Sequence, residues 1–176
     1  MLVYFLRHAS AGESLSDAQK DEKRPLDKEG VEQCQEVGRV LAALGVRADV
    51  ILSSPLKRAE QTAELAGREI GYQGKLIFDD GLRPGAGYGA FQSMLAQHSR
   101  GDSIFVVGHN PNLSEFLGRL IGDARTAAAI ELKKGAVAKV EVEGGRGSLD
   151  WCITPKIARA LQAAATKSSR PKTSRK

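Results

Sequence analysis

Two kinds of hydrophobic pattern alternate along the first three quarters of the chain. Short runs such as LVYFL at 2–6 and SIFVVG at 103–108 are almost wholly apolar, which is typical of strands buried on both faces of a sheet. Between such runs, apolar residues recur at steps of three and four, as in amphipathic helices. The segment from Asp27 to Gly45 has this spacing at Val31, Cys34, Val37, Leu41 and Leu44. The pattern predicts strands separated by helices.

Capping and turn residues place the other elements. Asp27 is a suitable N-cap for the first helix, and Gly45 is a suitable stop. Ser54 followed by Pro55 is typical of the start of another helix. We therefore expect further strands at 49–53 and 75–78, helices at 55–71, 89–99 and 110–122, and polar loops at 8–26 and 79–89.

The pattern changes beyond residue 128. The stretch AVAKVEVEGGRGSLDWCIT at 136–154 alternates apolar and polar residues around a glycine-rich turn, which predicts an antiparallel hairpin. Strands separated by helices of this length predict a mainly parallel sheet. The expected fold is thus an α/β three-layer sandwich, with helices on both faces of the sheet and the hairpin at one edge.

The length and the distribution of charge predict one domain followed by a short basic tail. Its 176 residues suit one domain, which we place at 1–160. The net charge of +5 arises from five basic residues in the last ten, KSSRPKTSRK, because the rest is formally neutral. We therefore expect a basic, flexible tail at 161–176, a frayed terminus more often than a contact for nucleic acid or anionic lipid. The folded part has no net charge that favours a nucleic-acid partner.

The apolar content indicates a cytoplasmic protein with no membrane partner. No apolar run approaches the roughly 18 residues that span a bilayer, and the N-terminus lacks the basic region and cleavage site of a secretory signal. Cys34 and Cys152 lie in apolar contexts without CxxC spacing. This favours reduced core thiols over a disulfide or a metal site.

Three predicted strand ends carry cationic or imidazole side chains. The first strand ends in Arg7-His8, the strand at 49–53 leads to Arg58 in the first turn of a helix, and SIFVVG leads to His109. The carboxyl ends of parallel strands line one crevice, and helix N-termini there also favour anions. The pattern predicts a phosphoryl site. Arginine matches phosphate oxygens in pairs, a neutral imidazole can attack phosphorus, and a protonated second imidazole can stabilise the transition state.

Each of these motifs alone has a simpler interpretation. Arg-His is common in loops, GHNP forms an ordinary turn before a helix, and Arg58 suits an exposed helix surface. The combination favours a phosphate site by about two to one. Arginine and histidine already supply positive charge, and no carboxylate cluster accompanies either histidine, so we expect no metal and no cofactor. His98 precedes a strand, at the opposite edge of the sheet, and receives no catalytic role.

At these residues the sequence resembles the histidine phosphatase superfamily, and within it the small SixA-like branch. The likeness covers about residues 1–155, and its motifs form a highly specific combination. The matching stretches are, in order, FLRHASA, RPLDKEG, VILSSPLKRAEQTAE and VVGHNPNLSEFL. The resemblance implies a phosphoglycerate mutase-like fold.

The resemblance also implies a mechanism. His8 is expected to accept the phosphoryl group as a transient phosphohistidine, while Arg7, Arg58 and His109 hold its oxygens and water then releases inorganic phosphate. Arg24 in RPL matches an arginine of this branch and is expected at the rim of the site. Ala9 replaces the glycine that usually follows Arg-His in the superfamily.

A second departure concerns the leaving group. Larger members carry an acid that protonates the leaving alkoxide, and here only Asp79, Asp80 and Glu13 are near candidates. Imidazole leaves phosphorus far more easily than an alkoxide does. The chain is also short at 79–103, where larger relatives insert a helical cap. Both points favour a phosphohistidine-bearing protein, such as a phosphotransfer domain, as substrate.

Two alternatives remain open at this stage. One is a phosphatase of small phosphate esters or nucleotides, and the other is a non-catalytic module that binds phosphoproteins. A burst of phosphate from phosphoramidate would separate the first from phosphohistidine hydrolysis, and His8→Ala would separate the second from an enzyme.

Overall fold

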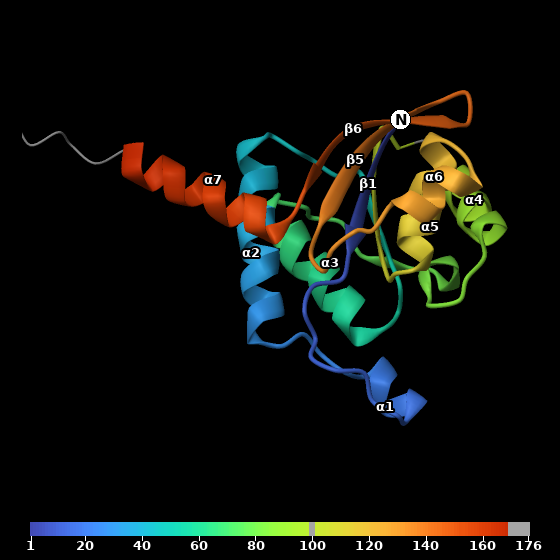
Figure 1. Ribbon diagram of the computed structural model, residues 1–176, viewed down its shortest axis with the longest axis horizontal. Coiled ribbons are helices and arrows are strands. Elements are labelled where there is room, and N and C mark those ends of the chain that lie inside the picture. The colour runs from blue at the N-terminus through green and yellow to red at the C-terminus, as the bar shows by residue number, and fades with distance from the viewer. Residues whose placement is uncertain (99–100, 169–176) are drawn as a thin grey trace, which may run out of the picture.

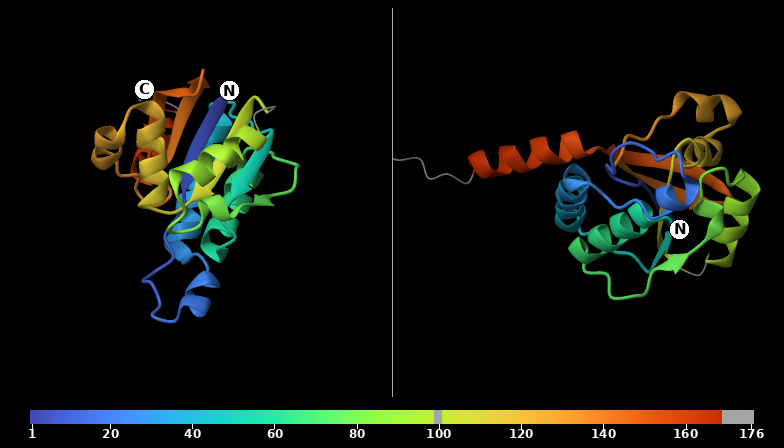
Figure 2. Two further views of the ribbon diagram at one scale, coloured as in Figure 1. Left: turned by 90° about the vertical axis from the view of Figure 1, so that its right-hand side faces the viewer. Right: turned by 90° about the horizontal axis from the view of Figure 1, so that it is seen from below.

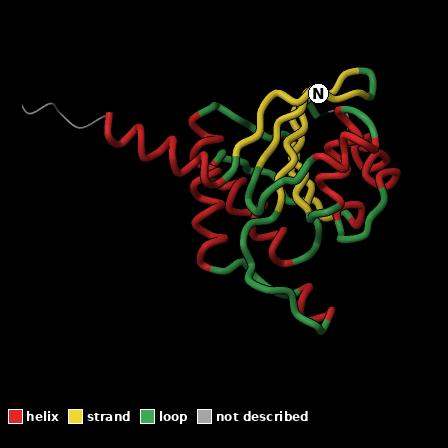
Figure 3. Tube along the Cα trace, viewed as in Figure 1, coloured by secondary structure: helices red, strands yellow, loops and turns green. Residues whose placement is uncertain are grey.

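A mixed sheet forms the centre of the computed structural model, which describes residues 1–98 and 101–168. Six strands of this part pair in the order β3-β2-β4-β1-β5-β6. Helices cover both faces of the sheet (Figures 1 and 3), so the predicted three-layer α/β fold is confirmed. The strands are β1 (Leu2–Arg7), β2 (Val50–Ser53), β3 (Ile77–Phe78), β4 (Ser103–Gly108), β5 (Val137–Glu143) and β6 (Arg146–Ile153).

Strand directions also follow the prediction. β1, β2, β3 and β4 pair in parallel, whereas β5 and β6 form the antiparallel hairpin at one edge. Alternate residues of β1 face opposite layers. Phe5 packs with Phe91 and Phe116 on one face, while Tyr4 packs with Leu41 on the other. The near-continuous apolar runs seen in the sequence arise because the central strands are covered on both sides.

The helices divide between the two faces. One layer contains α2 (Lys28–Ala43), α3 (Lys57–Glu69) and α7 (Pro155–Ser168), and the other contains α4 (Tyr88–Gln97), α5 (Asn112–Ile121) and α6 (Ala124–Ala129). A short helix α1 (Ala18–Glu22) and a 3-10 turn at Asp80–Leu82 complete the described elements. Figure 1 and the left view of Figure 2 show α1 at the bottom, extending from the rest of the body.

The predicted starts of helices α2 and α3 can be compared with the structure. The Asp27 carboxylate accepts a hydrogen bond from the Gly30 N–H, so the predicted N-cap of α2 is confirmed. The expected start of α3 at Pro55 is wrong, because this helix begins at Lys57 with Leu56 in the capping position. Ser54 instead lies fully buried below the helix, where its hydroxyl contacts a histidine.

The C-terminal region departs from the expected division at residue 160. Helix α7 crosses it and runs from Pro155 to Ser168 (Figure 1), so residues 161–168 of the expected tail are helical. The remaining tail, 169–176, lies outside the described residues. Cys34 is buried as expected, but Cys152 is exposed on β6, so the prediction of two core thiols is wrong for Cys152. No helix in the described part is long and apolar enough to cross a membrane.

Candidate active site

Adjacent strands bring the two predicted histidines together. β1 and β4 pair in parallel with Arg7 opposite Gly108, so the residues that follow, His8 and His109, leave the sheet side by side. The His8 N–H donates to the Gly108 carbonyl at 3.0 Å, and the imidazole centroids lie 4.9 Å apart. A pocket of about 690 Å³ opens over them. It is lined by Arg7, His8, Gly12, Glu13, Ser14, Arg24, Arg58, Pro84, His109, Asn110 and Lys134. The structure thus brings all five predicted site residues into one pocket.

The loop after His8 is fixed by the helix that follows it. The Asp27 carboxylate accepts hydrogen bonds from the Ser10 hydroxyl at 2.7 Å and from the Gly12 N–H at 2.8 Å. Gly30 lies against this loop so closely that an added Cβ would come within 2.0 Å of the Ser10 carbonyl oxygen. The motif RPLDKEG therefore holds the loop that carries the nucleophile candidate.

A backbone carbonyl determines which nitrogen of His8 is free. His8 Nδ1 lies 2.8 Å from the Ala9 carbonyl oxygen, which can only accept, so Nδ1 carries the proton. The neutral ring therefore keeps its lone pair on Nε2. Burial lowers the pKa of His8 to about 4, and the positive charges of Arg58 and Arg7 act in the same direction. His8 is therefore neutral at physiological pH.

Three buried nitrogens around this pocket lack a hydrogen-bond partner. They are Arg7 Nε, Arg58 Nε and His109 Nδ1, and among the described residues they are the full set of such side-chain atoms. Leaving a buried donor unpaired costs roughly 1–3 kcal/mol, more for a charged group. The unpaired donors belong to the residues that the sequence assigned to phosphate. Their arrangement suits a ligand with several acceptor oxygens.

Ser54 determines the orientation of the second histidine. His109 Nε2 lies 2.9 Å from the Ser54 hydroxyl, which also accepts a 3.4 Å hydrogen bond from the Leu56 N–H. When the hydroxyl donates its proton to Nε2, the imidazole proton lies on Nδ1. Burial, together with neighbouring His8, Arg58 and Arg7, lowers the pKa of His109 to about 2. Burial therefore favours the neutral imidazole of His109, while its protonation beside a phosphoryl group stays a prediction.

Asp21, which the sequence analysis missed, connects two arginines of the site. Its carboxylate accepts from Arg24 Nε at 2.8 Å and lies 3.2 Å from Arg58 Nη1. Its backbone carbonyl accepts a second bond from the same Arg58 Nη1 at 2.8 Å. The hydrogen bond from Arg24 is the largest cause that lowers the pKa of Asp21 to about 2. Asp21 is therefore an anion that fixes Arg58.

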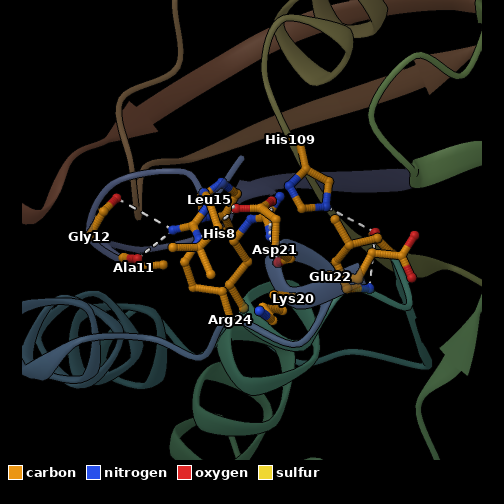
Figure 4. A network of polar contacts seen from close by, with 12 residues as sticks. His8, Ala11, Gly12, Leu15, Lys20, Asp21, Glu22, Arg24 and His109 are labelled. Carbon is orange, nitrogen blue, oxygen red and sulfur yellow. Dashed lines mark hydrogen bonds and ion pairs between the residues drawn. The ribbon is translucent and has the colours of Figure 1, made fainter. Parts of the chain in front are cut away.

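Arg24 lies at the rim and holds the loop. Besides Asp21, its guanidinium donates to the Ala11 and Gly12 carbonyls (Figure 4).

Lys134 also lines the pocket, although no motif in the sequence marked it. Arg7 donates from Nη1 to the Leu132 carbonyl at 2.7 Å, which orients its unpaired Nε.

The three candidate acids differ in whether they line the pocket. Glu13 lines the pocket, whereas Asp79 and Asp80 do not. Asp79 accepts a hydrogen bond from the Gly81 N–H, and exposed Asp80 pairs with Arg83. Within residues 1–98 and 101–168, no group of three or more His, Cys, Asp or Glu side chains is arranged to hold a metal ion.

Comparisons with known proteins agree with this geometry. The family model of the histidine phosphatase superfamily (branch 1) matches residues 3–85. An uncharacterized protein of Picosynechococcus sp. (strain ATCC 27264 / PCC 7002 / PR-6) is 35% identical over 140 residues, which is 78% of this chain and 82% of that protein. The phosphohistidine phosphatase SixA of Escherichia coli (strain K12) is 28% identical over 168 residues, covering 92% of this chain and 100% of SixA.

A solved structure supports the same relationship. The structure of the protein histidine phosphatase SixA complexed with tungstate superimposes with a TM-score of 0.77 at 26% identity. The match covers 89% of this chain and 98% of that one.

Proposed function

This chain belongs to the histidine phosphatase superfamily, and we propose that it is a phosphatase whose substrate is phosphohistidine on a protein. One observation carries the proposal. An unprotonated Nε2 on His8 lines the same pocket as Arg7, Arg58 and His109, each of which has a buried nitrogen without a hydrogen-bond partner. This is a nucleophile next to donors for the oxygens of a phosphoryl group.

The proposed reaction has two displacements at phosphorus. His8 Nε2 attacks and forms a P–N bond, while the P–N bond of the substrate breaks. The substrate ring leaves as neutral imidazole when its other nitrogen carries a proton. Water then attacks the phosphoryl group on His8, whose proton on Nδ1 allows His8 also to leave as a neutral ring. Arg7, Arg58 and His109 donate to the phosphoryl oxygens throughout, so we propose that no metal takes part.

The leaving group favours phosphohistidine over an ester. An alkoxide needs a proton from an acid as it leaves, whereas imidazole does not need one at that moment. Of the candidate acids, Glu13 alone lines the pocket, and it is exposed. This arrangement supports the proposal and makes hydrolysis of a small ester, with Glu13 as its acid, the second candidate.

Rapid quenching tests the proposal. The protein is mixed with a phosphotransfer domain phosphorylated on histidine, and the acid-labile phosphate is mapped. We expect a burst of one phosphoryl group per protein on His8, followed by release of inorganic phosphate. His8→Ala should abolish both, and added EDTA should change neither.

The second candidate makes different predictions. If Glu13 acts as an acid, p-nitrophenyl phosphate or phosphoglycerate should be hydrolysed as fast as phosphoramidate, and Glu13→Gln should slow the esters alone. Faster turnover of esters than of phosphohistidine would overturn the proposed substrate.

A further inference from the structure

A second hollow adjoins the catalytic pocket. It has a volume of about 650 Å³ and lies between α5 and α6. We call it the α5–α6 groove, and its lining residues are Arg7, Asn110, Pro111, Ser114, Glu115, Arg119, Ala124, Ala127, Ala128, Ile130 and Glu131. We propose that it binds the polypeptide segment that flanks the phosphohistidine of the substrate protein. This inference rests on the proposed function.

Two side chains place the groove directly beside the phosphoryl site. Arg7 and Asn110 line both the catalytic pocket and the groove. Both donate to the Leu132 carbonyl, from Arg7 Nη1 at 2.7 Å and from Asn110 Nδ2 at 2.9 Å. A protein whose phosphohistidine enters the catalytic pocket must therefore lie over or beside this boundary.

The size of the groove exceeds what the phosphoryl group needs. Sites for small organic molecules have volumes of about 300–1,000 Å³, and the catalytic pocket alone falls within that range. A phosphorylated imidazole does not fill both hollows. The groove thus provides contact area for a larger part of the substrate.

The walls of the groove suit a polypeptide. Ala124, Ala127, Ala128 and Ile130 give it short apolar side chains, against which another chain can pack closely. Helix α6 is fixed in place because Gly118 of α5 lies against it. A Cβ at Gly118 would come within 2.3 Å of the Ala127 Cα.

The charges in the groove argue against a nucleotide or another polyanion. Besides Arg7, its one cationic lining residue is Arg119, which pairs with Glu115 at 2.8 Å and lies over the ring of Tyr88. Glu131 adds a further carboxylate at the rim, paired with Lys133. The charged side chains at the edges of the groove are thus paired with opposite charges, and the alanines and Ile130 form its apolar surface.

The hollow on the other side of the site is a weaker candidate. It has about 350 Å³ and shares Ser14, Arg58 and Pro84 with the catalytic pocket. Its charged side chains are already paired with one another, Arg58 with Asp21 and Arg83 with Glu22. Covering it would desolvate ion pairs without burying comparable apolar surface.

Two neighbouring alanines allow a matched test. Ala128 lines the groove, whereas Ala129 does not, and both are exposed on α6. Ala128→Arg should lower kcat/KM roughly 10-fold or more for a phosphotransfer domain phosphorylated on histidine. It should leave kcat/KM for phosphoramidate within about twofold, because phosphoramidate does not reach the groove. Ala129→Arg should change neither value.

The outcomes distinguish the two proposals. An Ala128→Arg variant that matches the unsubstituted protein on the phosphorylated domain would overturn the groove and leave the proposed function standing. So would an equal loss on both substrates, or an equal loss with Ala129→Arg. A protein without these substitutions that does not hydrolyse the phosphorylated domain would overturn the proposed function, and the groove inference with it.

Discussion

Mild acid should destabilise this protein strongly, because two histidines are buried in the neutral state. Burial first, with neighbouring positive charges, lowers the pKa of His8 to about 4 and that of His109 to about 2. In the unfolded chain both return to about 6.5. Below that pH the unfolded state binds protons that the folded state does not. The stabilisation is therefore complete above about pH 6.5 and is lost as the pH falls toward the folded pKa values.

The size of the effect follows from these values. Between pH 7 and pH 5, protonation of the unfolded chain costs about 2 kcal/mol for each histidine, so the free energy of unfolding should fall by roughly 3–4 kcal/mol. Asp21 also has a lowered pKa, of about 2. Since an unfolded aspartate titrates near about 3.9, it contributes little above pH 5. The pH window therefore isolates the histidines.

Urea unfolding measures this directly. The fluorescence of Trp151, the one tryptophan, and circular dichroism give the free energy of unfolding at pH 7, 6 and 5. His8→Asn and His109→Asn should each remove about half of the pH dependence. His98→Asn is the matched control and should leave it intact, because His98 lies outside the pocket. A stability that is equal at pH 7 and pH 5 would refute the assignment of two neutral buried imidazoles.

Three further outcomes follow from the site. Lowering the pH should reduce kcat/KM for phosphoramidate only as His8 in the free enzyme becomes protonated, near about pH 4. The titration of the substrate itself is subtracted first. A fall in kcat/KM near the ordinary pKa of histidine would contradict this prediction. Asp21→Asn should lower kcat/KM roughly 10-fold, because Arg58 loses the anion that fixes it, and Asp21→Glu should restore part of it. Ser54→Ala should lower kcat/KM about 5- to 20-fold, with a changed ¹⁵N shift for His109 Nδ1; an unchanged shift would remove Ser54 from this role.

The strand ends were the most predictable part of the molecule. β1 and β4 are buried on both faces, so their sequences are continuous apolar runs whose ends are unambiguous. Once the strands are taken as parallel, the side chains that follow must meet at one edge. The proximity of His8 and His109 therefore needed no knowledge of side-chain contacts. Their roles in catalysis stay a prediction until the reaction is measured.

The contacts that orient those side chains were not predictable in the same way. Helix α1 has five residues and buries none of them, so it leaves no periodic apolar pattern. Asp21 on this helix reaches Arg58 through a contact between residues 37 positions apart. Ser54 precedes a proline and resembles an ordinary N-cap, but its hydroxyl faces His109. Such long-range polar pairs depend on the finished fold, whereas apolar periodicity is local.

The Ala9 carbonyl has a consequence for the chemical identity of the intermediate. A phosphorylated histidine exists as two isomers, according to which ring nitrogen bears phosphorus. Because this carbonyl retains the proton on Nδ1 of His8, the proposed mechanism can generate one isomer alone, with phosphorus on Nε2. The same contact keeps the phosphorylated ring cationic, the form from which phosphorus departs most readily. In the proposed mechanism, one main-chain oxygen thus selects the regiochemistry of the adduct and shortens its lifetime.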